Sequence, residues 1–305
     1  MKPNLSLSEL LGWDGASPLR ADLHCHSTIS DGSFTSAELL AQAQAAGLTH
    51  LAITNHDTTA GFDDAAAAAQ ALSAVPSNEG SAVITYVSGI EISAWNPVSE
   101  RKVHILGFGL KENSPAIAAL CGPTLRARTE NTAWQQEQLE KAGYSLDYEL
   151  LKKLRAASTG FYKQHLMEYL VATEQVEEMF GTFYHETFKN GGYCDFDIEY
   201  LDAAAAVRVI TEAGGLAVLA HPGQQQNLEL VPELVGYGLK GIELEHRKNT
   251  EADKEAIRQM AVQYGLFLTG GSDYHGTLED GSSELGSCLA TENALRIIFN
   301  NNSDK

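Results

Sequence analysis

Short apolar runs alternate with segments of helical pattern along most of the chain. The apolar runs predict strands, and they occupy residues 20–27, 50–57, 82–93, 102–110, 216–223, 239–247 and 266–276. The helical patterns between them occupy residues 35–47, 61–74, 201–215 and 251–265. We therefore expect an α/β fold with a mainly parallel sheet that is closed, or nearly closed, as a barrel. In such folds, functional side chains collect at the carboxyl ends of the strands.

This alternation stops between residues 114 and 197. The interruption contains two stretches of helical pattern, residues 125–143 and 159–192, and it is unusually rich in aromatic residues. We interpret residues 114–197 as a small helical insertion set into the barrel. The barrel itself is then assigned to residues 1–113 and 198–305.

Charge and composition narrow the class of partner. The formal net charge of the 305 residues is −19, so the surface as a whole should repel long nucleic acid, although a local basic pocket could bind a small anion or a short oligonucleotide. The chain has no apolar run of about eighteen residues and no secretory signal pattern at its start, so we expect a cytoplasmic protein without a membrane span. The four cysteines are far apart, which argues against a disulfide framework or a zinc ribbon.

Histidines and carboxylates gather at the predicted strand ends. His24 and His26 are two residues apart and therefore point to the same face of an extended segment. A lone histidine such as His56 is more often structural than a ligand, but a carboxylate inside an apolar run, such as Glu91, is rarely buried unless it is paired or bound to a metal. The full set of candidate ligands is His24, His26, Asp31, His56, Glu91, His104, His221, Asp273 and His275. Imidazole and carboxylate ligands without thiolate suit Mn²⁺, Fe²⁺ or Zn²⁺, and nine side chains could hold two or three such ions.

The motifs that carry these residues resemble a known family. DLHCHSTISDG, AITNHD, GIEIS, VHILGFG, AHPG and GSDYHG, in this order, are similar to the motifs of the PHP (polymerase and histidinol phosphatase) superfamily. The resemblance implies a distorted (β/α)7 barrel with a metal centre of, usually, three ions. It places His24, His26, Glu91 and Asp273 around the first ion. It lets Glu91 bridge to a second ion held by His104 and His221, and it assigns Asp31, His56 and His275 to the third ion.

Catalytic roles follow from the same resemblance. Clustered divalent ions would supply a metal-bridged hydroxide that attacks the phosphorus atom of a phosphate ester. Within that mechanism we assign catalytic roles to Asp31, Glu91 and His275. His275 and Asp57 are the candidates for protonating the leaving oxygen.

The insertion resembles that of the nucleotide-phosphoesterase branch of this superfamily. Members of that branch remove the 3′-phosphate from 3′,5′-bisphosphonucleotides or trim short RNAs from the 5′ end, and here the insertion would be a substrate-selecting cap. The branch usually carries Arg and His where this chain has Thr159 and Phe161. The candidates for binding a small phosphorylated substrate are Arg126, Arg128, Lys163, His165 and Arg247.

Two other functions fit the same residues. The chain could be a histidinol-phosphate phosphatase or a general small-molecule phosphatase that uses the same ions. From a different class, it could be a metal-binding scaffold without catalysis. A panel of substrates distinguishes a histidinol-phosphate or general phosphatase from a nucleotide phosphoesterase. Metal analysis of the purified protein tests the scaffold.

Overall fold

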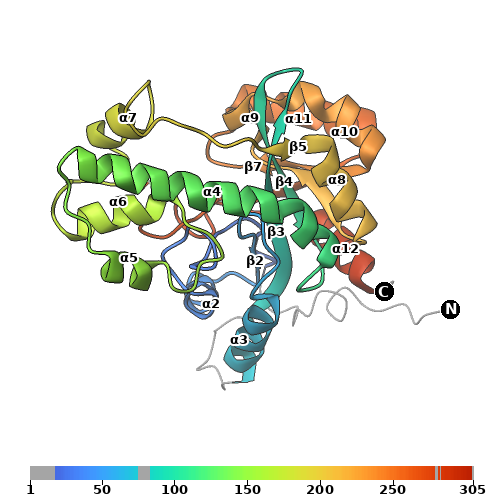
Figure 1. The fold of residues 1–305 in the computed structure, drawn as a ribbon. Helices are drawn as coiled ribbons and strands as arrows, with labels where there is room; N and C mark the ends of the chain where they lie inside the picture. The colour runs from blue at the N-terminus through green and yellow to red at the C-terminus, as the bar shows by residue number, and fades with distance from the viewer. Residues whose placement is uncertain (1–17, 75–82, 279–280, 282, 304–305) are drawn as a thin grey trace.

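The computed structural model describes residues 18–74, 83–278, 281 and 283–303 and contains one mixed sheet (Figure 1). Seven strands follow one another around this sheet in the order β1-β2-β3-β4-β6-β7-β8, and the short strand β5 pairs with β3. The strands are β1 (Ala21–Asp22), β2 (His50–Ile53), β3 (Thr85–Asn96), β4 (Arg101–Phe108), β5 (Leu201–Asp202), β6 (Leu216–Leu219), β7 (Leu239–Glu245) and β8 (Phe267–Gly270).

Backbone hydrogen bonds bring the two edges of the sheet together. The amide of Leu23 donates a hydrogen bond to the carbonyl of Gly270 (3.1 Å). The amide of Asp273 donates to the carbonyl of His24 (2.8 Å), and the amide of His26 donates to the carbonyl of Tyr274 (2.8 Å). The chain after β1 thus runs beside the chain after β8, and the seven strands form a nearly closed barrel. This confirms the α/β fold class, a distorted (β/α)7 barrel, expected from the sequence.

One strand runs against the others. β1, β2 and β3 are parallel, and so are β6, β7 and β8, but β4 is antiparallel to both of its neighbours, β3 and β6. β3 and β4 form a hairpin whose turn, residues 97–100, follows the carboxyl end of β3. The start of β4, rather than its end, therefore lies at the edge of the barrel where the parallel strands end.

Helices cover the outside of the sheet and build the insertion. They are α2 (Ser36–Ala45), α3 (Phe62–Ala74), α4 (Pro115–Lys141), α5 (Tyr148–Leu154), α6 (Lys163–Ala172), α7 (Thr182–Phe188), α8 (Ala203–Glu212), α9 (Pro222–Gln225), the 3-10 helix η1 (Leu228–Leu230), α10 (Val231–Tyr237), α11 (Glu251–Tyr264) and α12 (Glu292–Ser303). The Thr35 side chain and Glu38 form a reciprocal capping box at the start of α2. No helix within the described parts of the chain is long and apolar enough to cross a membrane.

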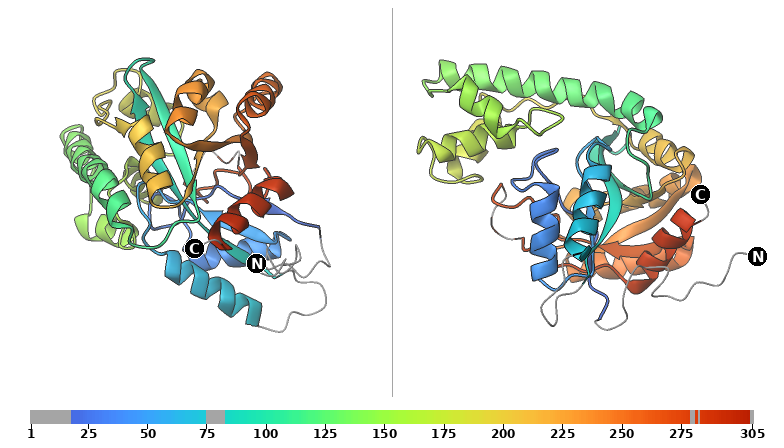
Figure 2. Two further views of the ribbon diagram at one scale, coloured as in Figure 1. Left: turned by 90° about the vertical axis from the view of Figure 1, so that its right-hand side faces the viewer. Right: turned by 90° about the horizontal axis from the view of Figure 1, so that it is seen from below.

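The insertion has a hydrophobic core of its own, and one helix joins it to the barrel. α4 has 27 residues; Ile117 and Cys121, in its first turns, pack into the barrel core with residues of β3, β4 and α8, whereas Leu139, near its end, packs with α5, α6 and α7. Figure 2 shows α4 running from the barrel to the other three helices of the insertion. We refer to the insertion, residues 114–197, as the cap.

Candidate metal centre

Strand alternation directs two of the candidate ligands into the barrel. On β3, Ile90 and Ile92 belong to the cluster that packs on the outer helices, so Glu91 between them points to the inside. On β4, Val103 and Ile105 face the same outer cluster, and His104 therefore also points inward. Glu91, a charged residue, is only 1% exposed. Such a burial requires compensating partners.

Glu91 lies at the middle of the histidines. Its Oε2 atom is 3.3 Å from His24 Nε2, 3.2 Å from His26 Nε2 and 3.3 Å from His56 Nδ1. Its other oxygen, Oε1, is 2.8 Å from His104 Nδ1 and 2.9 Å from His221 Nε2. Each carboxylate oxygen thus faces a different set of imidazoles, as a bridging ligand would.

The remaining candidates complete three overlapping groups of ligand atoms. In each group the atoms lie within 4.8 Å of one another; the groups are His26, Asp31, His56 and His275; His24, His26, Glu91 and Asp273; and His56, Glu91 and His104. Asp273 Oδ1 is 3.4 Å from His24 Nε2 and 3.3 Å from His26 Nε2. All nine residues predicted as ligands are therefore brought to one place in the barrel.

Several buried ring and carboxylate atoms in this cluster have no hydrogen-bond partner within the described residues. They are His24 Nε2, both ring nitrogens of His26, Asp31 Oδ1, His221 Nδ1 and His246 Nε2. Leaving such atoms unsatisfied is costly, unless a bound group completes them. Two ligands bound at right angles to one ion, each at about 2.1 Å, are about 3 Å apart. The spacings around Glu91 are close to that value, so the residues fit divalent ions bound through nitrogen and oxygen.

Electrostatics keeps the carboxylates of the cluster ionised. Burial alone would raise the pKa of Glu91, but the nearby rings of His104, His24 and His56 outweigh it and hold that pKa well below its usual range. Burial lowers the pKa of His56 to about 3, although Asp31 and Glu91 act in the opposite direction. Burial lowers the pKa of His26 as well, but Asp273 and Glu91 outweigh it and raise that pKa to about 9, and the carboxylates around His24 raise its pKa in the same way. His56 is thus already in the neutral form that binds a divalent ion, whereas binding at His24 and His26 would release a proton.

Two residues next to the ligands had not been singled out from the sequence. Glu243, on β7, is fully buried; its Oε1 lies 3.0 Å from His24 Nδ1, and its Oε2 accepts a hydrogen bond from the amide of His221 (2.7 Å). His246 follows β7 and places Nε2 3.5 Å from Asp273 Oδ2. Glu243 contacts Nδ1 of His24, the ring nitrogen that does not face Glu91, and so fixes the orientation of the ring. Residues that hydrogen-bond to a metal ligand commonly orient it in this way. The signal was available: Glu243, like Glu91, is a carboxylate inside an apolar run.

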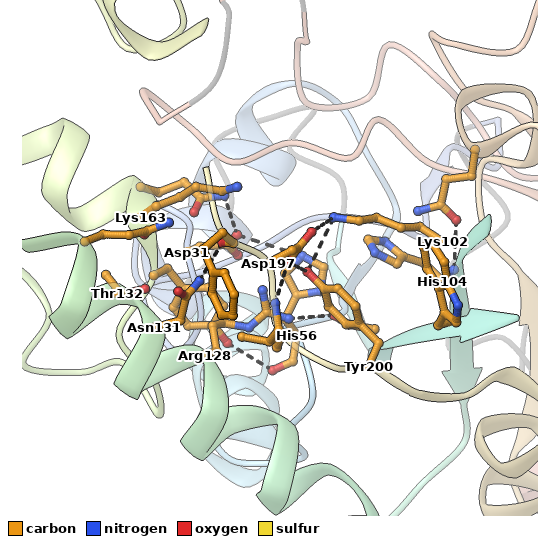
Figure 3. A pocket seen from close by; sticks show the side chains of 18 of the residues that line it. Asp31, His56, Lys102, His104, Arg128, Asn131, Thr132, Lys163, Asp197 and Tyr200 are labelled. Atoms are coloured by element: carbon orange, nitrogen blue, oxygen red, sulfur yellow. Dashed lines mark hydrogen bonds and ion pairs between the residues drawn. The ribbon is translucent and has the colours of Figure 1, made fainter. Parts of the chain in front are cut away.

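A cavity of about 500 Å³ opens beside the cluster (Figure 3). Asp31, His56 and His104 line one side, and residues of the cap line the other. The cationic side chains in its lining are Arg101, Lys102, Arg128 and Lys163. This volume is in the range of pockets that bind small molecules. A polar cavity shared by candidate metal ligands and cations suits a small phosphorylated ligand.

Two of the lining cations already have acidic partners. Arg128 donates to Asp57 Oδ2 (3.1 Å) and to Ser93 Oγ (3.0 Å), and its guanidinium lies over the ring of Tyr162. Lys102 pairs with Asp197, which also accepts a hydrogen bond from Tyr200. Lys102 was not singled out from the sequence, although it is two residues from His104 on one strand and so shares its face.

Only some of the predicted substrate-binding residues reach this cavity. Arg128 and Lys163 line it, whereas Arg126, which is exposed, and Arg247 are not in its lining. His165 is only 2% exposed, and its Nδ1 accepts a hydrogen bond from the amide of Tyr162 (3.2 Å) at the start of α6. His165 therefore stabilises the first turn of α6 and is not in the cavity lining.

Comparison with known proteins gives the same family as the site. The PHP domain family matches residues 22–197. A phosphoribosyl 1,2-cyclic phosphate 1,2-diphosphodiesterase from Eggerthella lenta is 50% identical over 255 residues, which cover 84% of this chain and 94% of that protein. A 3′,5′-nucleoside bisphosphate phosphatase from Chromobacterium violaceum is 31% identical over 268 residues, 85% of this chain and 88% of that protein.

Similar proteins also include a nuclease and a solved structure. A 5′-3′ exoribonuclease from Haemophilus influenzae is 30% identical over 260 residues, which cover 83% of this chain and 89% of that protein. A crystal structure from Bifidobacterium adolescentis, of a protein classed as a metal-dependent phosphoesterase, superposes with a TM-score of 0.81 at 26% identity, covering 93% of this chain and 97% of that one. The cluster of histidines and carboxylates, the barrel and these similarities together establish that the chain belongs to the PHP family and is a metal-dependent phosphoesterase.

Proposed function

We propose that this enzyme hydrolyses a phosphate ester on a small ribose phosphate that carries a second phosphate group. The observation that carries the proposal is the cavity, in which the candidate metal ligands share one lining with four cations. The similar proteins fit this substrate class. A phosphoribosyl cyclic phosphate and a 3′,5′-nucleoside bisphosphate, the substrates in two of their names, both carry phosphate at two places on one ribose. At 50% identity, the phosphoribosyl cyclic phosphate is the leading candidate.

A bisphosphonucleotide is the second candidate, and it is supported by aromatic side chains. Phe196 and Trp95 line the cavity, and Phe196 is 65% exposed, with its ring packed edge-on against Trp134. A large exposed ring beside a polar cavity offers a surface on which a nucleobase can stack. A substrate without a base would leave the exposed part of the Phe196 ring uncovered.

In the proposed reaction the protein residues bind, orient and hold protons in place. When bound, the divalent ions would activate a water molecule for attack and bind the phosphoryl oxygens. His275 Nδ1 lies 2.9 Å from the carbonyl oxygen of Asp273, which can only accept, so the proton is on Nδ1 and Nε2 keeps a lone pair. This tautomer suits His275 as a ligand and makes it a poor proton donor to the leaving oxygen. Asp57 is engaged by Arg128 and by the amide of Ser93, and it is poorly placed for that role as well.

The test is hydrolysis of a substrate panel by enzyme loaded with Mn²⁺, followed by ³¹P NMR. We expect kcat/KM to be at least about tenfold higher for phosphoribosyl 1,2-cyclic phosphate or a 3′,5′-bisphosphonucleotide than for a mononucleotide. The reason is that one added charge-assisted contact contributes about 1.5–3 kcal/mol. A preference for histidinol phosphate would favour the general phosphatase instead. No turnover of any phosphate ester by metal-loaded protein would favour the scaffold.

Lys163 offers a pH-dependent test of the second phosphate site. Burial, together with the positive charges of Lys189, Lys102 and Arg128, lowers the pKa of Lys163 to about 7, with Asp197 acting in the opposite direction. Lys163 is thus mostly charged below about pH 7 and mostly neutral above it, so its attraction for an anion weakens as the pH rises. We expect the ratio of kcat/KM for a substrate with two phosphates to kcat/KM for one with a single phosphate to fall between pH 6 and pH 8.

The Lys163→Met variant should flatten that pH dependence and lower the ratio about tenfold at pH 6. Lys141→Met is the matched control, because Lys141 is an exposed lysine at the end of α4 and is not in the cavity lining, so its loss should leave the dependence in place. An unchanged ratio in Lys163→Met at both pH values would exclude Lys163 from binding the second phosphate.

Several sequence-based expectations stay proposals. We expect two or three ions per chain, and we expect Mn²⁺, Fe²⁺ or Zn²⁺. We also keep residues 114–197 as a substrate-selecting cap, with a cytoplasmic enzyme that binds neither long nucleic acid nor a membrane. Metal analysis by inductively coupled plasma mass spectrometry, after purification with added Mn²⁺, tests the first of these. Less than about one equivalent per chain would count against the whole site.

A further inference from the structure

The cap is attached by hydrogen bonds to the loop that carries Asp31. Ser158 Oγ donates to the carbonyl of Ser30 (2.7 Å), and both the amide (2.9 Å) and the hydroxyl (3.1 Å) of Thr159 donate to the carbonyl of Ile29. These contacts link residues far apart in the sequence. They hold the start of α6 directly above the loop that follows β1.

The next contact in this series reaches Asp31 itself. Gln164, in the first turn of α6, donates from Nε2 to Asp31 Oδ2 at 3.0 Å. An ionised carboxylate can only accept, so the amide nitrogen is the group that faces it. Asp31 is 1% exposed, and the contact takes place inside the cavity lining, to which both residues belong. The cap thus supplies a hydrogen bond to a candidate metal ligand of the barrel.

The two oxygens of Asp31 are in different situations. Oδ2 accepts the hydrogen bond from Gln164 and is also 3.8 Å from His56 Nε2, whereas Oδ1 has no hydrogen bond among the described residues and is 3.7 Å from both His26 Nδ1 and His275 Nε2. A free carboxylate can bind an ion through both oxygens or swing between them. The Gln164 donor occupies a lone pair of Oδ2 and leaves Oδ1, which faces two of the three imidazoles, free to bind an ion.

We propose that Gln164 is a positioning residue that holds Asp31 as a one-oxygen ligand of the group formed with His26, His56 and His275. The metal affinity of this group then depends on the cap, although its ligands all come from the barrel. This inference rests on the proposed role of Asp31 as a metal ligand and does not depend on which phosphate ester is the substrate. Among the described residues, no hydrogen bond joins Gln164 to the other two groups of ligands, which both contain Glu91, so we expect these groups not to depend on it.

The experiment is a titration of the metal-free enzyme with Mn²⁺, in which free Mn²⁺ is counted by electron paramagnetic resonance. Gln164→Leu keeps the volume of the side chain and removes the donor. We expect one class of bound ion to be weakened about tenfold, since outer partners of metal ligands contribute about 10–100-fold to affinity, and the other class to be unchanged. Gln164→Asn, whose amide is one methylene too short to reach Asp31, should give the same result if the Leu variant folds poorly.

Glu168→Leu is the matched control, one turn later on α6 and outside the cavity lining, and it should bind Mn²⁺ as the unchanged enzyme does. The Asp31→Asn background separates positioning from a general effect on stability. If Gln164 acts through Asp31, adding Gln164→Leu to Asp31→Asn causes no further loss of affinity, whereas a structural role gives an additive loss.

Four results would overturn the proposal. An unchanged isotherm in both Gln164 variants would show that the hydrogen bond does not position the ligand. An equal loss for every bound ion, or additivity with Asp31→Asn, would assign Gln164 to the fold. If Asp31→Asn itself left Mn²⁺ binding unchanged, the ligand role of Asp31 would fail, and the inference with it, while the substrate proposal would still stand.

Discussion

Replacing Glu91 by Gln should lower kcat/KM by about 10⁴-fold, which corresponds to about 5.5 kcal/mol of transition-state stabilisation. Glu91 Oε1 faces His104 and His221, and Oε2 faces His24 and His26, so a single side chain serves two sets of ligands. In Gln, one of the two oxygens becomes an amide nitrogen, which has no lone pair to offer a metal. The second ion would be lost or displaced, and with it the stabilisation of charge on the phosphoryl oxygens.

The measurement combines steady-state kinetics with metal analysis. We expect Glu91→Gln to retain the unfolding temperature of the metal-free protein and to bind at least one equivalent of metal less than the unchanged enzyme. Glu100→Gln makes the same chemical change at an exposed carboxylate of the cavity rim and should alter kcat/KM by less than about threefold. Near-normal turnover with full metal content in Glu91→Gln would show that this residue does not bridge two ions.

Removing the metal should abolish activity and also destabilise the fold. The cluster buries Asp31, Glu91 and Glu243 almost completely, and several ring nitrogens beside them have no partner in the described chain. Bound ions would satisfy these atoms, and a ligand at a hundredfold excess over its Kd adds about 2.7 kcal/mol to the free energy of unfolding. For a chain of 305 residues we expect chelation to lower Tm by about 4 °C for each ion bound at that excess.

Differential scanning calorimetry before and after dialysis against a chelator provides the test, with metal content measured on the same samples. Adding back Mn²⁺ should restore both Tm and turnover, whereas Ca²⁺, which prefers six to eight oxygen ligands, should restore neither. The opposite finding, full activity and an unchanged Tm with less than about 0.1 equivalent of metal, would mean that the cluster is structural without ions.

Much of the fold, and the gathering of the candidate ligands at one place, could be predicted from the sequence, because alternation in a strand determines which side chains share a face. It places Glu91 and His104 on one side of their strands without any structure. The direction of β4 was not accessible, since a period of two is the same in a parallel and an antiparallel strand. The reversal matters, because it brings Lys102 to the rim beside His104.

The cap was harder to interpret, because helical residues can be assigned to a face only when the position of the helix is known. Arg126 and Arg128 are two residues apart on α4, so they point about 200° apart and cannot both face one cavity. The structure turns Arg128 towards the cavity and Arg126 to solvent. The sequence alone gives no reason to choose between them. The burial of His165 likewise follows from its contacts within the cap, where its ring lies beside those of Phe161 and Tyr162, and no local pattern reveals them.

The continuity of α4 constrains how the cap can be exchanged between relatives by protein engineering. A chimera joined in the loop before residue 115 would replace Ile117 and Cys121, which fill the barrel core, and would leave cavities costing about 2–5 kcal/mol for a large residue lost. A junction inside the helix near Pro123, in register with the turn, would leave those side chains in place. A chimera made in this way would take its substrate-binding residues from the relative and keep the packing of the barrel core. The second junction would lie in residues 189–200, at the other end of the cap.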